Sequence, residues 1–151
     1  MKVEPAAPGD ETRVKELLAA CGLPYEDIAP LHLQHFLVLR DGPRLAGVIG
    51  LEVLGKCALL RSLAVPASQR GKGIGSQLTR QVETYALSQQ IETLYLLTTT
   101  AEGFFAGRGY RRAEREAVPA PIQETAEFRS LCPSTAVCMV KHLEVSKLVD
   151  W

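Results

Sequence analysis

The sequence lacks the features that mark several specialised classes of protein. Its N-terminus, MKVEPAAPGDE, contains no apolar run, so neither a signal peptide nor a membrane span is expected, and the predicted location is cytoplasmic. Basic residues are not in excess, because 17 Lys and Arg balance 17 Asp and Glu. Nucleic-acid-binding proteins usually carry a basic excess, so neither nucleic acid nor a membrane is expected as a partner.

Metal-binding and redox motifs are also missing. The four cysteines are Cys21, Cys57, Cys132 and Cys138. They form no Cys-x-x-Cys pair, so reduced and mostly buried thiols are expected. Two histidines three positions apart, close to a proline, are too few for a zinc site, and no metal site is predicted.

What is present is the composition of an ordinary globular protein. Hydrophobic residues make up 46% of the 151 residues and charged residues 23%. A chain of this length buries about 70% of its unfolded surface. Because it contains no repeat and no low-complexity tract, residues 1–151 are predicted to form a single domain.

The most informative stretch covers residues 59–90. An apolar strand, LLRSLAV, leads through PASQ and the loop RGKGIG into a long amphipathic helix. Gly71, Gly73 and Gly75 allow backbone angles closed to other residues and leave the main chain open to a ligand. The free amides of the following helix would point at an anion, and Arg70 and Lys72 add positive charge.

Spacing separates the nucleotide-type interpretations of this loop. A Walker loop needs Gly-Lys-Ser/Thr at its end, where this loop has Gly75-Ser76-Gln77. A dinucleotide fingerprint wants glycine where Ser76 stands, and it usually lies in the first strand-turn-helix unit of a chain. The pattern Arg-x-x-Gly-x-Gly is filled by Arg70, Gly73 and Gly75. A glycine turn that binds no ligand stays open as the simplest alternative.

The remaining elements follow from periodicity and turn signals. Expected strands are residues 1–6, 35–39, 45–54, 58–65, 94–98, one beginning at Tyr110, and 136–145. Expected helices are 10–21, with Asp10 as N-cap and Gly22 as stop, then one after the glycine loop to about 90, 101–108 stopped by Gly109, and 122–131. Asp41-Gly42 predicts a hairpin whose loop Pro43 makes longer than two residues, and Gly55-Lys56 predicts a second tight turn. The strand-helix-strand order around the loop predicts a parallel, right-handed crossover.

Two segments resemble the GNAT superfamily of N-acetyltransferases: LAVPASQRGKGIGSQL and EGFFAGRGY, within a similarity over residues 38–141. The resemblance implies an α/β (α+β) fold, with a mixed sheet of six to seven strands flanked by four to five helices. An antiparallel N-terminal meander and a splayed parallel pair of strands are part of this fold. The segment PAPIQETAEFRSLCPSTAVCMVK is similar to small bacterial N-acetyltransferases encoded beside arsenic-resistance genes and to amino-acid N-acetyltransferase modules.

The resemblance implies transfer of the acetyl group of acetyl-coenzyme A to the primary amine of a small, amino-acid-like acceptor, by direct attack in a ternary complex. An arsenic-containing amino-acid analogue is one candidate, and the resemblance allows a homodimer. The backbones of Leu63 and Val65 would polarise the acetyl carbonyl. The residues implied in cosubstrate binding are Leu63, Ala64, Val65, Arg70, Gly71, Lys72, Gly73, Ile74, Gly75, Ser76 and Phe104.

The proton-transfer residues stay undefined. Phe105 stands where the family usually has an acidic tyrosine, and Leu59 stands where some members have a basic glutamate. The candidates that could replace them are Tyr85, Tyr95, Thr98, Thr99, Tyr110 or water. Since a thiolate with the pKa of an ordinary thiol, about 8.5, leaves readily, a dedicated acid is not required.

Arg61 is the predicted contact to the acceptor. It lies two positions before Leu63, so strand alternation places both on one face, and its guanidinium fork suits a carboxylate. An internal ion pair with Glu52 is the equally weighted alternative. The helix expected at residues 122–131, which carries Phe128, is predicted to cover the acceptor site, and simple packing is its alternative.

Two other functions are compatible with the sequence. Phe105 and the missing glutamate favour a non-catalytic acyl-coenzyme A sensor, which would bind the thioester without turnover. A protein that binds arsenicals through Cys132 and Cys138 would lose function on Cys-to-Ser changes and tolerate Gly73→Val. Acetyl transfer predicts the reverse.

Overall fold

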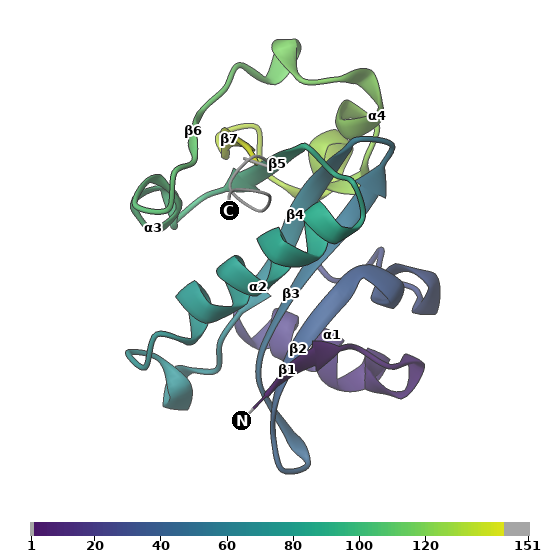
Figure 1. Cartoon of the computed structure of the whole chain (residues 1–151), viewed down its shortest axis with the longest axis vertical. Coiled ribbons are helices and arrows are strands. Elements are labelled where there is room, and N and C mark those ends of the chain that lie inside the picture. The colour runs from purple at the N-terminus through teal and green to yellow at the C-terminus, as the bar shows by residue number, and fades with distance from the viewer. Residues whose placement is uncertain (1, 144–151) are drawn as a thin grey trace, which may run out of the picture. The chain divides into compact units, whose positions relative to one another are not determined.

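The computed structural model describes residues 2–143, which form a seven-stranded mixed sheet of order β1-β2-β3-β4-β5-β7-β6 (Figure 1). The predicted fold class is confirmed. Contacts divide the chain into two compact units. Unit 1 comprises residues 1–52 and 61–85, and unit 2 comprises residues 53–60 and 86–151.

Unit 1 begins with the strands β1 (Val3–Pro5), β2 (Phe36–Asp41) and β3 (Arg44–Leu54). The antiparallel pairing of β2 with β3 was predicted, whereas that of β1 with β2 was not. Asp41 pairs with Arg44, so the connecting loop has two residues, and the prediction of a longer loop is wrong. The reason is Gly42, whose φ of +62° suits the first central position of a tight hairpin turn, followed by a proline.

Helix α1 (Glu11–Ala20) ends just before Gly22, the residue predicted to stop it, where φ is +71°. Asp10 stands at the N-cap position of this helix, as predicted, but its side chain makes no capping hydrogen bond. Its Oδ2 instead accepts a hydrogen bond from the Ala7 amide at 2.7 Å, and the buried carboxylate pairs with Arg40 of β2. A carboxylate that accepts two hydrogen bonds from one guanidinium forms a charge-assisted pair, which is stronger than an ordinary capping hydrogen bond.

The core of unit 1 joins α1 to the strands. Its buried members are Val14, Leu18, Ile28, Leu33, Phe36, Val38, Leu45, Val48 and Ala64. Helix α2 (Ile74–Ser88) lies over β3 (Figure 1), with Leu78 and Ile74 packed against the bare backbone of Gly47. The absence of a side chain at Gly47 therefore sets how closely α2 approaches the sheet.

Unit 2 contains the predicted parallel pair. Strand β4 (Cys57–Ala64) pairs with β5 (Thr93–Thr98) from Cys57↔Thr93 to Leu59↔Tyr95. On its other side β5 pairs antiparallel with β7 (Val137–His142), which also pairs with the two-residue β6 (Arg111–Arg112). The last strand was predicted to end at residue 145, and residues 144–145 lie outside the described part.

The helix predicted over residues 122–131 is wrong as a single element. Unit 2 instead has α4 (Ala120–Gln123) and a π-helical turn (Glu127–Leu131), after the short α3 (Glu102–Ala106). Thr125 causes the break, because its hydroxyl donates to the Ile122 carbonyl at 2.8 Å and accepts the Phe128 amide at 3.4 Å. A threonine that bonds nearby main-chain groups competes with the helical ladder.

The buried core of unit 2 gathers on one face of its strands. It consists of Leu59, Val118, Ile122 and Cys138, lined by Leu54, Cys57, Tyr95, Leu97, Ala113 and Phe128. Among residues 2–143, no helix is long and apolar enough to cross a membrane.

Candidate functional site

The glycine loop joins the end of β4 to the start of α2 within unit 1. Gly71 and Gly73 have φ of +82° and +79°, in the left-handed region that favours glycine. Gly75 lies in the first turn of α2 instead, so the prediction of an unusual backbone angle is wrong for that residue. A Cβ atom built at Gly71 or Gly73 would meet no atom within 4 Å, so both face open space. The loop thus presents bare main chain to a ligand.

The N-terminus of α2 follows this open turn directly. The Gln77 amide donates to the Gly73 carbonyl at 3.0 Å, which begins the helical ladder. Amides that precede the first such bond, as those of Ile74 and Gly75 do, have no acceptor within a helix. Together with the positive end of the helix dipole, they suit an anion such as a phosphate.

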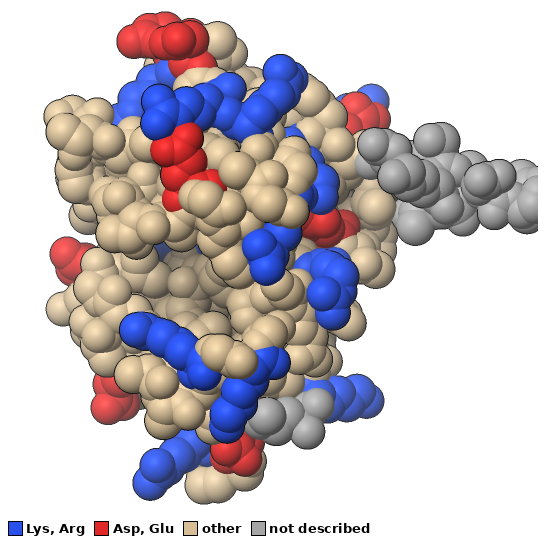
Figure 2. All heavy atoms as spheres, turned by 90° about the vertical axis from the view of Figure 1, so that its left-hand side faces the viewer, with Lys and Arg blue, Asp and Glu red and all other residues tan. Residues whose placement is uncertain are grey.

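Two exposed cations shape the loop. The Nε of Arg70 donates to the Val65 carbonyl at 3.1 Å, which closes the loop at its base. Lys72 Nζ donates to the Gln69 side chain at 3.0 Å. The positive charge of Arg70 and Lys72 is local, because the whole chain has no net charge at pH 7. Figure 2 shows acidic side chains next to basic ones on one face. Arg70 and Lys72 thus add positive charge beside the open turn, where an anion would bind.

The strand that leads into the loop is not regular. Ser62 has φ of +64°, which is uncommon for a residue with a side chain. The alternation that placed Arg61 and Leu63 on one face requires an unbroken strand, so that argument does not hold here. Leu63, Ala64 and Val65 follow immediately, with Ala64 buried and the other two half-buried.

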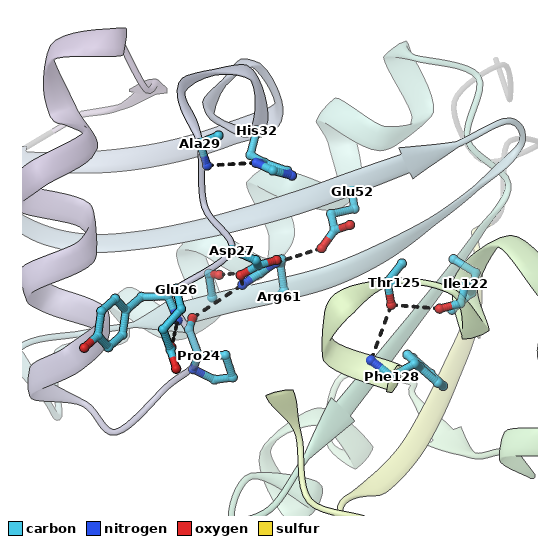
Figure 3. A network of polar contacts seen from close by, with 12 residues as sticks. Pro24, Glu26, Asp27, Ala29, His32, Glu52, Arg61, Ile122, Thr125 and Phe128 are labelled. Carbon is cyan, nitrogen blue, oxygen red and sulfur yellow. Dashed lines mark hydrogen bonds and ion pairs between the residues drawn. The ribbon is translucent and has the colours of Figure 1, made fainter. Parts of the chain in front are cut away.

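Arg61 forms the ion pair that was the alternative to its predicted role (Figure 3). Its Nη1 donates to Glu52 Oε1 at 2.7 Å and to Asp27 Oδ2 at 2.5 Å, and its Nη2 donates to Asp27 Oδ1 at 2.8 Å. Nη2 also reaches the Pro24 carbonyl at 3.4 Å, and Nε reaches Ser62 Oγ at 3.0 Å. A guanidinium has five N–H donors, so each has an acceptor.

Sequence reasoning found Glu52 but missed Asp27. Glu52 belongs to the strand next to β4, whereas Asp27 lies in a segment without periodicity. Burial tends to raise the pKa of Asp27, but the hydrogen bonds and charge of Arg61 outweigh it and hold this pKa below its ordinary value. The only available signal was that a buried arginine needs more than one acceptor.

The aromatic residues of the predicted site lie in unit 2. Phe105 is 5% exposed and packs edge-on against Phe104 and Tyr110, at centroid distances of 5.1 Å and 5.4 Å. The guanidinium of Arg108 lies 3.7 Å from the Phe104 ring centroid. Phe128 belongs to the π-helical turn, where it lines the core of unit 2.

The candidate proton-transfer residues are partly engaged. The hydroxyl of Tyr85 lies 2.5 Å from His35 Nδ1, and burial raises the pKa of this tyrosine. Thr98 Oγ1 accepts the Ala101 amide at 2.9 Å. Burial raises the pKa of Tyr95 as well, so neither of these two phenols is poised as a base at neutral pH.

The cysteines and histidines form no metal site in the described residues. None of the four cysteines forms a disulfide, and only Cys138 is buried, so the prediction of mostly buried thiols is wrong. No group of three His, Cys, Asp or Glu side chains between residues 2 and 143 is arranged to hold a metal ion. Burial raises the pKa of Cys57 and Cys138, which keeps both protonated at neutral pH.

Comparison with known proteins agrees with this geometry. Residues 9–112 match the acetyltransferase (GNAT) family model. An uncharacterised N-acetyltransferase of Chlorobaculum tepidum is 32% identical over 105 residues, which is 61% of this chain and 65% of that protein. An amino-acid acetyltransferase of Ectopseudomonas mendocina is 36% identical over 64 residues, or 42% of this chain and 15% of that protein. The chain thus spans less than two thirds of these relatives.

A solved structure has the same fold over nearly the whole chain. N-acetylglutamate synthase of Neisseria gonorrhoeae, complexed with coenzyme A and N-acetyl-glutamate, superposes with a TM-score of 0.82 at 21% identity. The match covers 95% of this chain and 35% of the synthase. With the family model covering residues 9–112, the chain belongs to the GNAT family of acetyltransferases.

Proposed function

We propose that the protein transfers the acetyl group of acetyl-coenzyme A to the primary amine of a small, amino-acid-like acceptor. The observation that carries this proposal is the open turn at Gly71 and Gly73, which leads into the N-terminus of α2. Its bare amides and the flanking Arg70 and Lys72 fit the diphosphate of coenzyme A.

The strand before the loop would hold the reacting end of the cosubstrate. The main chain of Leu63, Ala64 and Val65 is proposed to pair with the pantetheine arm, and an amide there to polarise the thioester carbonyl. Only a donor can polarise a carbonyl, so this role falls to a main-chain N–H, while the Val65 carbonyl accepts a hydrogen bond from Arg70 Nε. The thioester supplies an activated acyl group and a good leaving thiolate.

Positioning accounts for the chemistry without a dedicated acid. The deprotonated amine attacks the carbonyl carbon, the C–N bond forms, the C–S bond breaks, and the amine proton leaves to water or a base. Phe105 is a buried ring in this chain and Leu59 is a buried aliphatic side chain, so neither transfers a proton. Orientation alone supplies several powers of ten in rate.

The acceptor is proposed from the relatives. Both the Ectopseudomonas mendocina protein and the Neisseria gonorrhoeae synthase bear names of amino-acid acetylation. An amino acid, or an arsenic-containing analogue of one, acetylated in the cytoplasm is therefore the favoured substrate. Glu52, Phe104 and Phe128 keep their predicted contacts as proposals. The predicted direct contact of Arg61 with an acceptor carboxylate would require the acceptor to displace one of the protein groups that now accept hydrogen bonds from Arg61.

A non-catalytic acyl-coenzyme A sensor is the second candidate. The observation that favours it is that the positions of the family's usual acid and base, Phe105 and Leu59, are buried and apolar. Such a protein would bind acetyl-coenzyme A and release no thiol with any amine.

The test combines calorimetric binding of acetyl-coenzyme A with a thiol-release assay over a panel of amines. Gly73→Val places a branched side chain over the turn and is expected to weaken binding at least tenfold, about 1.4 kcal/mol. Gly55→Val is the matched control, because Gly55 has φ of +71° and equally open surroundings but lies in the β3–β4 turn. It should lose comparable stability and keep the affinity.

Each other outcome rejects a specific idea. If the wild-type protein binds no acetyl-coenzyme A, the proposed function fails. Binding without turnover on any amine supports the sensor. If Cys132→Ser and Cys138→Ser abolish activity while Gly73→Val does not, an arsenical-binding function replaces both.

A further inference from the structure

Residues 23–29 of unit 1 have no regular structure, and the buried side chain of Arg61 holds them in place. Residues 23–29 lie between α1 and the 3-10 turn Pro30–His35. Ile28 anchors the segment in the core at 2% exposure, while Tyr25 stands 37% exposed. Asp27 and the Pro24 carbonyl are held by the guanidinium of Arg61.

The same guanidinium also bonds a residue of β4 that has an unusual backbone conformation. Arg61 Nε donates to Ser62 Oγ at 3.0 Å, and Ser62 has φ of +64°. A non-glycine residue in this conformation persists only where its surroundings over-determine it. Leu63 comes next, at the start of the backbone proposed to hold the thioester. Arg61 thus ties residues 23–29 to the residue before this backbone.

The pair of Arg61 and Asp27 is strong because it is largely shielded from solvent and bidentate. The Arg61 side chain is fully buried, and the side chains of Asp27 and Glu52 are 18% and 16% exposed. Two parallel N–H···O bonds between Arg61 and Asp27 fix the relative orientation of both groups. A lysine could neutralise the carboxylates but could not reproduce this fork.

We propose that Arg61 is a positioning residue for the acetyl transfer. By bonding Asp27 and Pro24 on one side and Ser62 on the other, it fixes the backbone at Leu63–Val65, on which the thioester would lie, against residues 23–29. The inference rests on the proposed function. It differs from direct recognition of an acceptor carboxylate, since every N–H of the guanidinium already faces a protein acceptor.

The chain offers a matched control for breaking such a pair. Arg40 of β2 forms two hydrogen bonds to Asp10, at 2.8 Å and 2.7 Å, and it also pairs with Glu4. This pair likewise ties an N-terminal segment to a strand of unit 1, but it contacts neither residues 23–29 nor Ser62. Asp10→Asn therefore removes the same kind of interaction elsewhere.

The experiment compares Arg61→Lys, Asp27→Asn and Asp10→Asn in steady-state kinetics, with amines that bear or lack a carboxylate. Arg61→Lys and Asp27→Asn are expected to lower kcat/KM for the amine about 10- to 100-fold, the cost of a small misplacement of reactants. The loss should be the same for both kinds of amine, with the Kd of acetyl-coenzyme A changed less than about threefold because the glycine loop is intact. Asp10→Asn should lower the Tm similarly and keep kcat/KM.

Three results would overturn the inference. A loss confined to amines with a carboxylate would assign Arg61 to direct binding. An equal loss in Asp10→Asn would reduce the effect to general stability. Wild-type kinetics in Asp27→Asn would show that the pair of Arg61 and Asp27 does not position the reactants.

Hydrogen exchange separates this inference from the proposed function. If the wild-type protein binds acetyl-coenzyme A but acetylates no amine, the proposed acetyl transfer fails. The role of Arg61 in holding residues 23–29 is then tested by amide exchange alone. Asp27→Asn should then speed exchange of residues 23–29 at least tenfold and leave α1 unchanged, because local opening is governed by local contacts. Unchanged exchange in residues 23–29 would show that the pair of Arg61 and Asp27 does not hold this segment, and would overturn the inference as well.

Discussion

At the scale of single residues, two arginines organise unit 1. Arg40 and Arg61 each take an aspartate in a bidentate pair and add a glutamate. The side chain of Arg61 is fully buried, whereas that of Arg40 is 32% exposed. A buried guanidinium with fewer acceptors would be costly, since an unpaired buried charge is far more expensive than a neutral group. Removal of any of these carboxylates should therefore lower the free energy of unfolding.

The Asp10 carboxylate makes stability depend on pH in a defined direction. Hydrogen bonds from Arg40 hold the pKa of Asp10 below its ordinary value of 3.8. A depressed pKa in the folded state means that the carboxylate stabilises the fold above pH 3.8, and that this contribution is lost as the pH falls through the folded-state pKa. We expect Asp10→Asn to lower the free energy of unfolding at pH 7 by about 1–3 kcal/mol.

Urea unfolding between pH 2 and 7 checks this expectation. The gap between wild type and Asp10→Asn should stay constant down to about pH 4.5 and shrink at lower pH. A gap that widens as the pH falls would contradict the assigned ion pair.

The sequence predicted single residues where one local rule was decisive. Gly22, Gly42 and Gly55 mark turns because each needs the left-handed region, and all three have positive φ. Asp10 takes the predicted N-cap position, but its pairing with Arg40 was not foreseen, because an N-cap and a partner for a distant arginine look identical in sequence. Asp27 was missed for the same reason, since no local pattern reports a partner 34 positions away.

At the scale of elements, the loop between β4 and α2 was predictable, whereas the segment after residue 118 was not. The loop follows from a fixed spacing of Arg70, Gly73 and Gly75 after an apolar strand. The segment 122–131 has the hydrophobic content of one helix, but Thr125 turns its hydroxyl to the main chain and splits it into α4 and a π-helical turn. Periodicity alone does not report such side-chain competition.

Strand β3 provides a stability test at this scale. A Cβ atom at Gly50 would lie 2.3–2.4 Å from the ring of Phe36, which is fully buried. Gly50→Ala should therefore destabilise the protein by about 1–3 kcal/mol through overpacking.

Gly47→Ala is the comparison within the same strand. Its Cβ would meet a terminal methyl of Leu78 at 2.7 Å and a methyl of Ile74 at 3.1 Å. The end of a leucine side chain can rotate away, whereas a ring locked in the core cannot, so the loss should be smaller than for Gly50→Ala. Equal losses in urea unfolding, or a larger one for Gly47→Ala, would contradict this packing.

At the scale of the whole molecule, the antiparallel N-terminal strands and the parallel pair of β4 and β5 were predictable, because short turns and one crossover leave few topologies. The position of β7 between β5 and β6 was not predicted. The division into two units was not predicted. It arises from where the contacts of β3 and β4 fall, since the chain passes from unit 1 to unit 2 after Glu52 and returns at Arg61. The single domain predicted over residues 1–151 stays a prediction.

This interleaving leads to a prediction about unfolding. Strands β3 and β4 and helix α2 each contribute residues to both units, so neither unit is a continuous piece of chain that could fold alone. We expect one cooperative transition in calorimetry, with an enthalpy of about 100 kcal/mol near 60 °C at about 0.7 kcal/mol per residue. The calorimetric and van't Hoff enthalpies should agree, as they do for a two-state domain. Two resolved transitions, of which acetyl-coenzyme A raises only one, would instead mean that the unit carrying Gly71 and Gly73 unfolds on its own.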